Sequence, residues 1–97
     1  MPTYVALMKL TEQGAKDIKN APKRAQEFIK GLEAMGGKLQ GFYLTMGEYD
    51  YVGIAEAPSD EVALTFLMGL GAAGNVKTTT LKAFKLEDFT PLVNKLP

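Results

Sequence analysis

The side chains that could do chemistry in this sequence are carboxylates, phenols, hydroxyls and a single guanidinium, because the 97 residues include no Cys and no His. Glu48 and Asp50 stand on either side of Tyr49, and carboxylates placed there could act as general acid or base or offer oxygen ligands to a divalent cation. At the start of a predicted strand, Asp50 is also suited to accept backbone N–H bonds at a turn. We favour this structural role for Asp50, and we predict no metal site.

The missing residue types exclude several classes of function. Without Cys or His the chain cannot form disulfides or zinc fingers, ligate iron–sulfur clusters or haem in the usual ways, or use Ser-His-Asp catalysis. Its 11 basic and 11 acidic residues give a net charge of zero, which does not provide the positive surface that attracts nucleic acids and acidic membranes. The sequence therefore predicts no cofactor, no nucleic-acid partner and no membrane partner.

The only cluster of basic residues comprises Lys16, Lys19, Lys23 and Arg24. Acidic residues interleave with this cluster, which favours a solvated helix face over an anion site. Arg24 is the candidate if one member of the cluster binds a ligand, because its planar guanidinium can hold a carboxylate.

Residues 69–74 match the G-x-G-x-x-G string of dinucleotide-binding sites. In those sites the glycines follow a strand and open a helix, whereas here they follow a helical pattern and lead into a strand. We therefore expect a helix end that approaches the sheet or a partner closely, with Gly74 or Asn75 in the left-handed conformation.

The elements that position these residues follow from hydrophobic periodicity and from turn residues. N-caps are predicted at Thr11, Asn20 and Ser59, and a tight hairpin turn is predicted at residues 47–49. The predicted strands cover residues 4–10, 38–46, 50–57 and 76–84, and the predicted helices cover 11–19, 20–35 and 59–73, with a short tail helix from Thr90.

This order of strand, helix, strand, strand, helix, strand predicts a single domain over residues 1–97. Right-handed crossovers give one four-stranded antiparallel sheet in the order 4-1-3-2, with both main helices on one face. This is the α+β ferredoxin-like arrangement. The first residues contain no leader pattern, and we expect a cytoplasmic protein.

The strands divide into two unlike rows of side chains, because alternate residues point to opposite faces of a sheet. One row is aliphatic, and we assign it to the core beneath the helices; it consists of Val5, Leu7, Phe42, Leu44, Met46, Val52, Ile54, Leu81 and Ala83. The other row is rich in tyrosine, threonine and small residues, and we assign it to the uncovered face; it consists of Tyr4, Ala6, Met8, Gly41, Tyr43, Thr45, Tyr51, Gly53, Ala55, Thr78, Thr80 and Lys82.

A sheet face of this second kind is too apolar to remain in water and too polar to be an ordinary core. We expect it to form an interface between identical subunits, since a chain of this length has little volume with which to enclose a ligand. Either the tyrosines pack against the second subunit, or they line a ligand cavity. The candidate ligand-binding residues are Tyr4, Tyr43, Tyr51, Thr78 and Thr80, with Glu48 and Asp50 at the mouth of the cavity.

Several motifs are typical of one family: Lys9-Leu-Thr-Glu-Gln-Gly14, Gly36-Gly-Lys38, Gly47-Glu-Tyr-Asp50 and Gly74-Asn-Val-Lys-Thr78. Over nearly its whole length the chain resembles the GYD domain family. The resemblance implies a place in the dimeric α/β-barrel superfamily, in which two ferredoxin-like sheets face each other. It implies little chemistry, because the family is named after its sequence signature.

The part of the chain from Gly47 onward also resembles the effector-binding domain of feast-or-famine regulators, which take up amino acids between subunits. The helix-turn-helix domain of those regulators is absent from this sequence. The resemblance implies that the hairpin at residues 47–50 and the strand that carries Thr78 and Thr80 form the rims of a pocket.

Three functions are compatible with these observations. The leading one is a homodimer or higher homo-oligomer that binds a small molecule, an anion or an amino-acid-like acid, at a cavity between subunits. The second is a small cofactor-free enzyme of the isomerase kind, with Tyr43 or Tyr51 and Asp50 or Glu48 as acid and base. The third is a structural assembly unit that binds no ligand.

Overall fold

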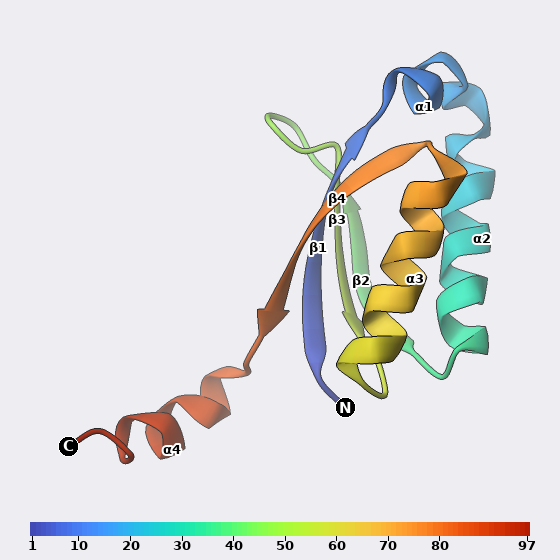
Figure 1. Ribbon diagram of the computed structural model, residues 1–97. Helices are drawn as coiled ribbons and strands as arrows, with labels where there is room; N and C mark the ends of the chain where they lie inside the picture. The colour runs from blue at the N-terminus through green and yellow to red at the C-terminus, as the bar shows by residue number, and fades with distance from the viewer.

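The computed structural model describes all residues from Met1 to Pro97 and has two layers, one sheet and one pair of long helices (Figure 1). The sheet is antiparallel with the strand order β2-β3-β1-β4, so the predicted topology and the ferredoxin-like fold are confirmed. The strands are β1 (Thr3–Leu10), β2 (Lys38–Leu44), β3 (Tyr51–Glu56) and β4 (Val76–Ala83); the helices are α1 (Glu12–Lys16), α2 (Ala21–Ala34), α3 (Asp60–Ala73) and α4 (Phe89–Val93), with two short 3-10 helices, η1 (Ile18–Asn20) and η2 (Leu86–Asp88).

Most of the predicted helix ends are confirmed. The Thr11 hydroxyl accepts the N–H of Gly14 at 3.1 Å, and the Ser59 hydroxyl accepts the N–H of Val62 at the start of α3. Gly74 ends α3 with a φ of 81°, in the left-handed region that favours glycine. Asn20 was predicted to cap α2, but its amide donates to the Asp17 carboxylate at 2.6 Å instead.

The start of α1 is fastened to the turn between α3 and β4. The Thr11 N–H donates to the carbonyl of Asn75 at 3.1 Å, and the Thr11 hydroxyl donates to the carbonyl of Gly74 at 2.5 Å. Gly14 is buried against the same turn, where an added Cβ would lie 2.1 Å from the Asn75 oxygen. This close approach explains why a glycine occupies position 14.

The hairpin between β2 and β3 is wider than predicted. The strands end at Leu44 and begin again at Tyr51, so the prediction of strands to residue 46 and from residue 50 is wrong. The Thr45 hydroxyl donates to the carbonyl of Tyr49 at 2.5 Å, and this bond closes the loop between the two strands. Within the loop, Gly47 adopts a φ of 103°. Met46, which was predicted to lie in the core, is 99% exposed.

The faces of the sheet are the reverse of those predicted in β1, β3 and β4. Residues directly opposite each other in an antiparallel pair share a face, and Ala6 lies opposite Gly53 and Thr80, next to residues that contact the helices. Val5 lies opposite Ile54 and Leu81 on the other face. The aliphatic row is therefore the uncovered one, and the row with small residues lies beneath the helices, where it accommodates their large side chains.

Strand β2 differs because its pairing shifts by one residue between Leu39 and Gly41. The irregularity inverts the alternation, so that Phe42 lies opposite Gly53 on the helix side while Tyr43 lies opposite Val52 on the uncovered side. In this strand the predicted faces of Phe42 and Tyr43 are correct.

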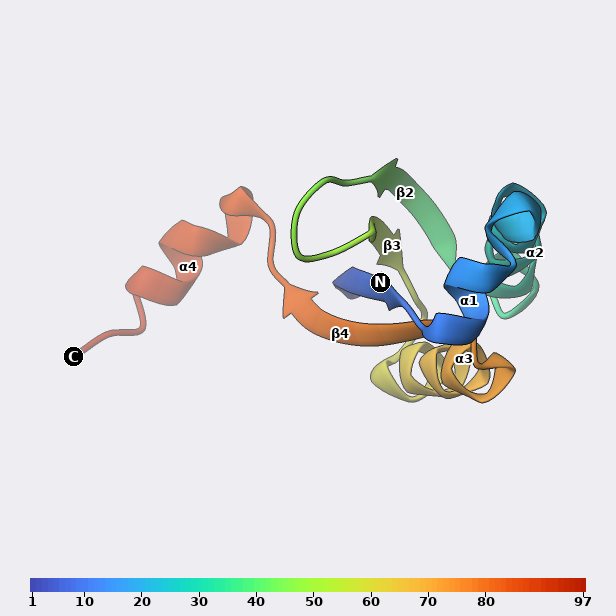
Figure 2. The same cartoon turned by 90° about the horizontal axis from the view of Figure 1, so that it is seen from above.

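The chain exposes more surface than a compact chain of its size. A 10.5 kDa chain is expected to expose about 5,400 Å² and to have a radius of gyration of about 12.5 Å. The observed values are 6728 Å² and 14.9 Å. One contribution is visible in Figures 1 and 2, where the segment that follows β4 points away from the domain. None of the helices has both the length and the apolar sequence needed to span a bilayer.

Candidate functional site

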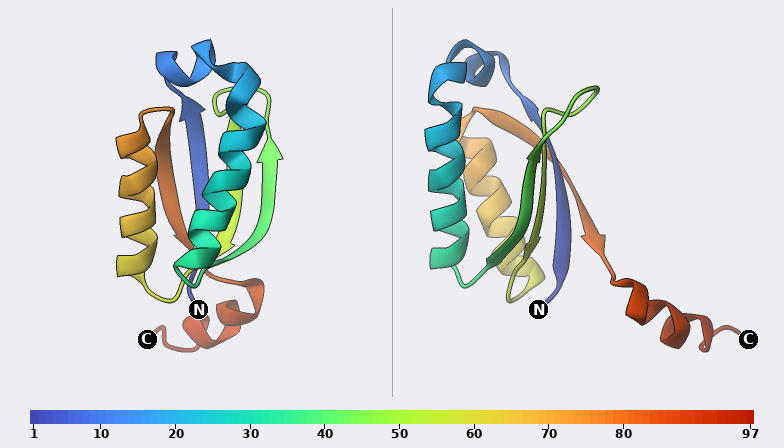
Figure 3. Two further views of the ribbon diagram at one scale, coloured as in Figure 1. Left: turned by 90° about the vertical axis from the view of Figure 1, so that its right-hand side faces the viewer. Right: turned by 180° about the vertical axis from the view of Figure 1, so that it is seen from behind.

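The uncovered side of the sheet carries a contiguous set of apolar side chains, which we call the open face; it consists of Val5, Leu7, Val52, Ile54, Leu81 and the ring of Tyr43. Leu81 is 53% exposed and Tyr43 is 58% exposed. The hairpin between β2 and β3 and the segment after β4 both project on this side, at opposite ends of the sheet (Figure 3, right). The open face is thus an apolar surface with a projection at each end.

The hairpin bends over the end of the open face. The ammonium of Lys9 lies 3.4 Å from the carboxylate of Glu48 and 5.4 Å from the centre of the Tyr49 ring. Lys9 lies directly opposite Lys77 in the β1–β4 pair, and Lys77 has no acidic group within ion-pair distance. Two lysines therefore occupy directly opposite positions at this end of the open face, and only Lys9 has a carboxylate, that of Glu48 in the hairpin, within ion-pair distance.

Asp50 joins the hairpin to β1. Its carboxylate accepts the N–H of Leu10 at 2.7 Å, and its own N–H donates to the carbonyl of Met8 at 2.9 Å. The Leu10 N–H is partly buried, and a donor of this kind that loses its acceptor is costly. The geometry agrees with the structural role favoured for Asp50, with its side-chain hydrogen bond directed to β1 and not to the turn itself.

Replacing Asp50 with Ala is expected to lower the free energy of unfolding by about 0.5–2 kcal/mol. The variant leaves the N–H of Leu10 without its acceptor, whereas Asp50→Asn retains an oxygen that can accept the bond. Urea unfolding of the two variants beside the wild type measures the difference. Equal stability of the wild type and Asp50→Ala would contradict the structural role.

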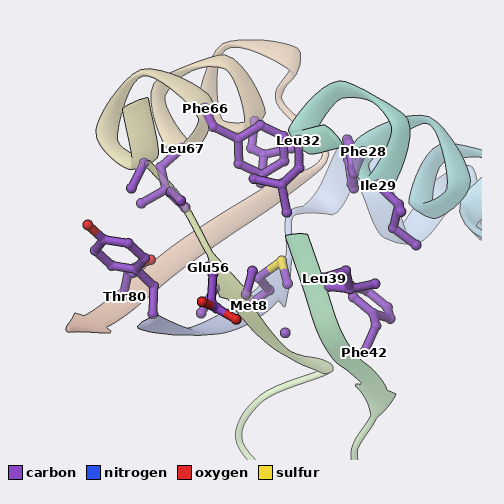
Figure 4. A pocket seen from close by; sticks show the side chains of 17 residues that line it. Met8, Phe28, Ile29, Leu32, Leu39, Phe42, Glu56, Phe66, Leu67 and Thr80 are labelled. Carbon is purple, nitrogen blue, oxygen red and sulfur yellow. The ribbon is translucent and has the colours of Figure 1, made fainter. Parts of the chain in front are cut away.

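A cavity of about 70 Å³ lies between the sheet and the two long helices (Figure 4). Phe28 and Leu32 of α2 and Phe66 of α3 lie above the strands that carry Met8 and Thr80, and the lining also includes Tyr4. Pockets for ligands of drug size usually measure about 300–1,000 Å³, so this cavity is a small gap within the core. Tyr4 and Thr80 line this gap beneath the helices, so their assignment to the uncovered face is wrong.

Tyr4 belongs to a polar cluster at the edge of this core. Its hydroxyl donates to Asp60 at the start of α3, and the other oxygen of Asp60 lies 3.0 Å from the ammonium of Lys82. Loss of solvation raises the pKa of Tyr4 to about 12, and the hydrogen bond to Asp60 and its charge act in the same direction. The Tyr4 hydroxyl and then Lys82 lower the pKa of Asp60. The alternation of side chains places Tyr4 and Lys82 in one row of the sheet, but the contribution of Asp60 was missed.

Stability is expected to fall between about pH 10, the ordinary pKa of tyrosine, and pH 12, because Tyr4 holds its proton more tightly in the folded state. Its contribution is complete below pH 10 and is lost as the pH rises through the folded pKa. Tyr4→Phe cannot ionise at this position, so its free energy of unfolding should fall less steeply over the same range. Denaturant unfolding at several pH values compares the two proteins, and identical slopes would contradict this role of Tyr4.

Arg24 binds within its own chain. Its guanidinium lies 2.8 Å from the carboxylate of Asp17, and it also donates to the carbonyls of Asp17 and Gly14. The side chain is 14% exposed. The carboxylate that Arg24 holds is therefore Asp17, and the contact fixes the turn between α1 and α2.

The structure does not bring the predicted ligand-binding residues together. Tyr43 lies on the open face, while Tyr51 packs against Phe42 on the helix side at a ring separation of 5.5 Å. Thr78 lies opposite Met8 and shares the helix side with Tyr4 and Thr80. The tyrosines named for acid–base chemistry thus lie on opposite faces, and the structure contains no group of three acidic side chains that could hold a metal ion.

The outer side of α3 is a second apolar surface. Leu64 and Met68 are 58% and 59% exposed there, and an added Cβ at Gly69 or Gly71 would meet no atom within 4 Å. Gly69 and Gly71 therefore do not approach the sheet closely, so that part of the prediction is wrong for these two glycines. They leave a shallow, apolar helix surface with small side chains.

Comparison with known proteins identifies the class of this molecule and then its family. Three solved structures share its fold: TTHA0845 from Thermus thermophilus (TM-score 0.56, 21% identity, 88% of this chain and 95% of that one), FFRP-DM1 (0.58, 20%, 87% and 100%) and the hypothetical protein PHS023 from Pyrococcus horikoshii (0.57, 19%, 91% and 95%). The GYD domain model matches residues 4–93. The chain therefore belongs to the GYD domain family.

One relative has a name that describes a function. The glutamine synthetase and cystathionine beta-lyase binding protein of Thermus thermophilus is 34% identical over 89 residues, which cover 91% of this chain and 94% of the relative. The match extends over nearly the full length of both proteins.

Proposed function

We propose that this protein is a small regulatory domain that assembles with itself through the open face and binds metabolic enzymes through the outer side of α3. The observation that carries the proposal is the presence of two separate apolar surfaces on one small chain of zero net charge. Large exposed apolar patches on small domains mark surfaces for protein contacts. The name of the relative from Thermus thermophilus, a binding protein of two enzymes, supports the proposal that the partners are metabolic enzymes.

The two surfaces suit different partners because they lie on opposite layers of the molecule. The sheet side carries the open face, while α3 covers the other side of the sheet (Figure 1). A second copy that covers the open face leaves Leu64 and Met68 exposed on the outside of the assembly. Amphipathic helices usually present polar residues to solvent, so this exposed apolar stretch on α3 is the surface assigned to the enzyme.

A small-molecule site between subunits is a second candidate, and the lysine pair at the end of the open face favours it. Like charges placed directly opposite each other in a sheet repel, and Lys9 and Lys77 form such a pair beside the hairpin at residues 47–50. An anion, such as the carboxylate of an amino acid, would relieve this repulsion. Lys77→Gln should then weaken the binding of amino acids measured by calorimetry, while leaving self-association in place.

The enzyme-binding role is tested with the glutamine synthetase and the cystathionine β-lyase of the same organism. Wild-type protein immobilised on a sensor surface is expected to bind at least one of the two enzymes. Replacing both Leu64 and Met68 with Asp should weaken that binding by about tenfold or more, because a charge in a desolvated contact is costly.

The matched control is Lys30→Asp, which places the same side chain at an exposed position of α2. This variant should bind the enzymes as the wild type does, and all variants should keep the same circular dichroism spectrum. Absence of binding by the wild type to both enzymes would contradict the proposal. Equal loss of binding in the α2 control would contradict the assignment to α3.

A further inference from the structure

The segment at residues 84–97, which we call the arm, is exposed along its whole length. It contains η2 and α4 and extends away from the domain on the side of the open face (Figures 1 and 2). Its large apolar side chains are uncovered, with Leu86 at 84% and Leu96 at 69% exposure. Exposed apolar side chains of this size favour a contact that removes them from water.

The apolar residues of the arm form one stripe. Leu86, Phe89, Leu92, Val93 and Leu96 recur at spacings of three and four, the pattern of a helix that buries one side. The polar residues Lys85, Glu87, Asp88 and Lys95 carry two charges of each sign. The stripe is therefore suited to pack against an apolar surface, and the balanced charges beside it favour a partner surface of low net charge.

The arm cannot keep its helix without such a surface. α4 has 5 residues, and isolated helices shorter than about 12–15 residues are marginal in water. The backbone bonds that hold the end of the arm are local, such as the bond from Asn94 to Thr90 at 3.0 Å. The ordered helix thus needs a contact that the domain of the same chain does not supply.

We propose that the arm of each chain packs against the domain of a second copy of the same chain. This inference rests on the proposed self-association and adds a second contact to it. The arm follows directly from Leu81 and Ala83, which lie on the side of the open face, so the stripe continues that apolar surface. A second copy that covers the open face lies beside the arm, and two-fold symmetry places its own arm against the first chain.

The exposed surface area of the chain is consistent with an interface in which each arm packs against the other copy. The chain exposes 6728 Å², roughly 1,300 Å² more than a compact chain of its mass. A stable interface removes about 800 Å² from each partner. The open face and the arm together hold enough excess surface for one such interface, and a net charge of zero places no repulsion between two copies.

Cross-linking distinguishes a second copy from the same chain. The sequence contains no Cys, so Lys95→Cys can carry a single benzophenone on the arm, and Lys30→Cys provides a matched control on α2. Isotope-labelled and unlabelled protein are mixed, allowed to exchange subunits, and irradiated, and the linked peptides are identified by mass spectrometry. We expect arm peptides linked to domain peptides of the other isotope, and no such links from position 30.

Linked peptides of one isotope only would show that the arm folds onto its own domain and would overturn the proposal. Absence of links from position 95 in a protein that sediments as a dimer would also overturn it, while leaving the self-association in place. A protein that sediments as single chains would instead contradict the proposed self-association.

A second measurement uses the full chain with a charged stripe. Phe89→Asp combined with Leu92→Asp is expected to raise the dissociation constant of self-association by about tenfold or more, with an unchanged domain because both residues lie outside it. An unchanged dissociation constant would overturn the role of the arm. Dissociation by an open-face variant, with no effect of the arm variant, would assign the whole interface to the sheet.

Discussion

Replacing Ile54 with Glu is expected to convert the proposed assembly into single chains at micromolar concentration. Ile54 lies in the middle of the open face, directly opposite Val5 of β1, and Leu81 continues the same row. In the proposed interface a carboxylate at this position would lose its water without gaining a partner, which is expected to raise the dissociation constant by about 100-fold or more. Sedimentation equilibrium over a range of concentrations measures this change.

Tyr51→Glu is the contrasting variant, because it changes a position of the same strand that faces the helices. Tyr51 packs against Phe42 on that side, so the charge should lower the free energy of unfolding of the domain itself. Ile54→Glu should retain the circular dichroism spectrum of the wild type. The reverse result, with Tyr51→Glu folded and dissociated and Ile54→Glu unfolded, would show that the faces are assigned wrongly.

Replacing Gly14 with Ala is expected to have the largest effect on stability, a loss of about 3 kcal/mol. The added Cβ would lie 2.1 Å from the Asn75 carbonyl oxygen, which is backbone and cannot rotate away. Any shift that relieves this clash disturbs the bonds that Thr11 makes to Gly74 and Asn75. Thermal or urea unfolding measures the loss.

Gly69→Ala provides the control within a helix. Nothing lies within 4 Å of its added Cβ, and alanine is favoured over glycine in helix interiors by about 0.5–1 kcal/mol. The Gly69 variant should therefore be as stable as the wild type or more stable. Similar stability of the Gly14 and Gly69 variants would contradict the close packing of α1 on the turn after α3.

The fold could be predicted from the sequence because its signals are local. Thr11 and Ser59 mark helix starts by the chemistry of their side chains, and Gly74 marks a helix end by its freedom to adopt positive φ. The alternation of strands and helices then leaves few topologies, since crossovers are right-handed. The strand order follows from these constraints and is the one observed.

The faces of the sheet could not be predicted in the same way, because a period of two separates two rows without showing which row is covered. The aliphatic row was placed in the core because it is the more apolar, whereas small residues such as Gly53 and Ala55 lie beneath the helices. The irregularity at residues 39–41 inverts β2 relative to its neighbours, and the only sequence feature that marks it is Gly41, since an isolated glycine in a strand often accompanies a bulge. When both rows of a sheet are largely apolar, both of its sides are expected to be covered, one by the helices of the chain and the other by a partner.

The roles of the candidate site residues depended on partners far away in the sequence. Asp50 was interpreted as a turn residue, but the N–H that it accepts belongs to Leu10. Arg24 was considered for an external carboxylate, but the one it holds is that of Asp17. The chemical preference of each side chain was predictable, whereas the identity of the partner was set by the tertiary fold.

The central claim is that the open face of the sheet holds two or more copies together. Sedimentation equilibrium of the unmodified protein at micromolar concentration tests it most directly, because the mass of the chain is known to be 10.5 kDa. We predict a mass of at least two chains that is retained on dilution through the micromolar range. A mass of one chain throughout that range would contradict the claim.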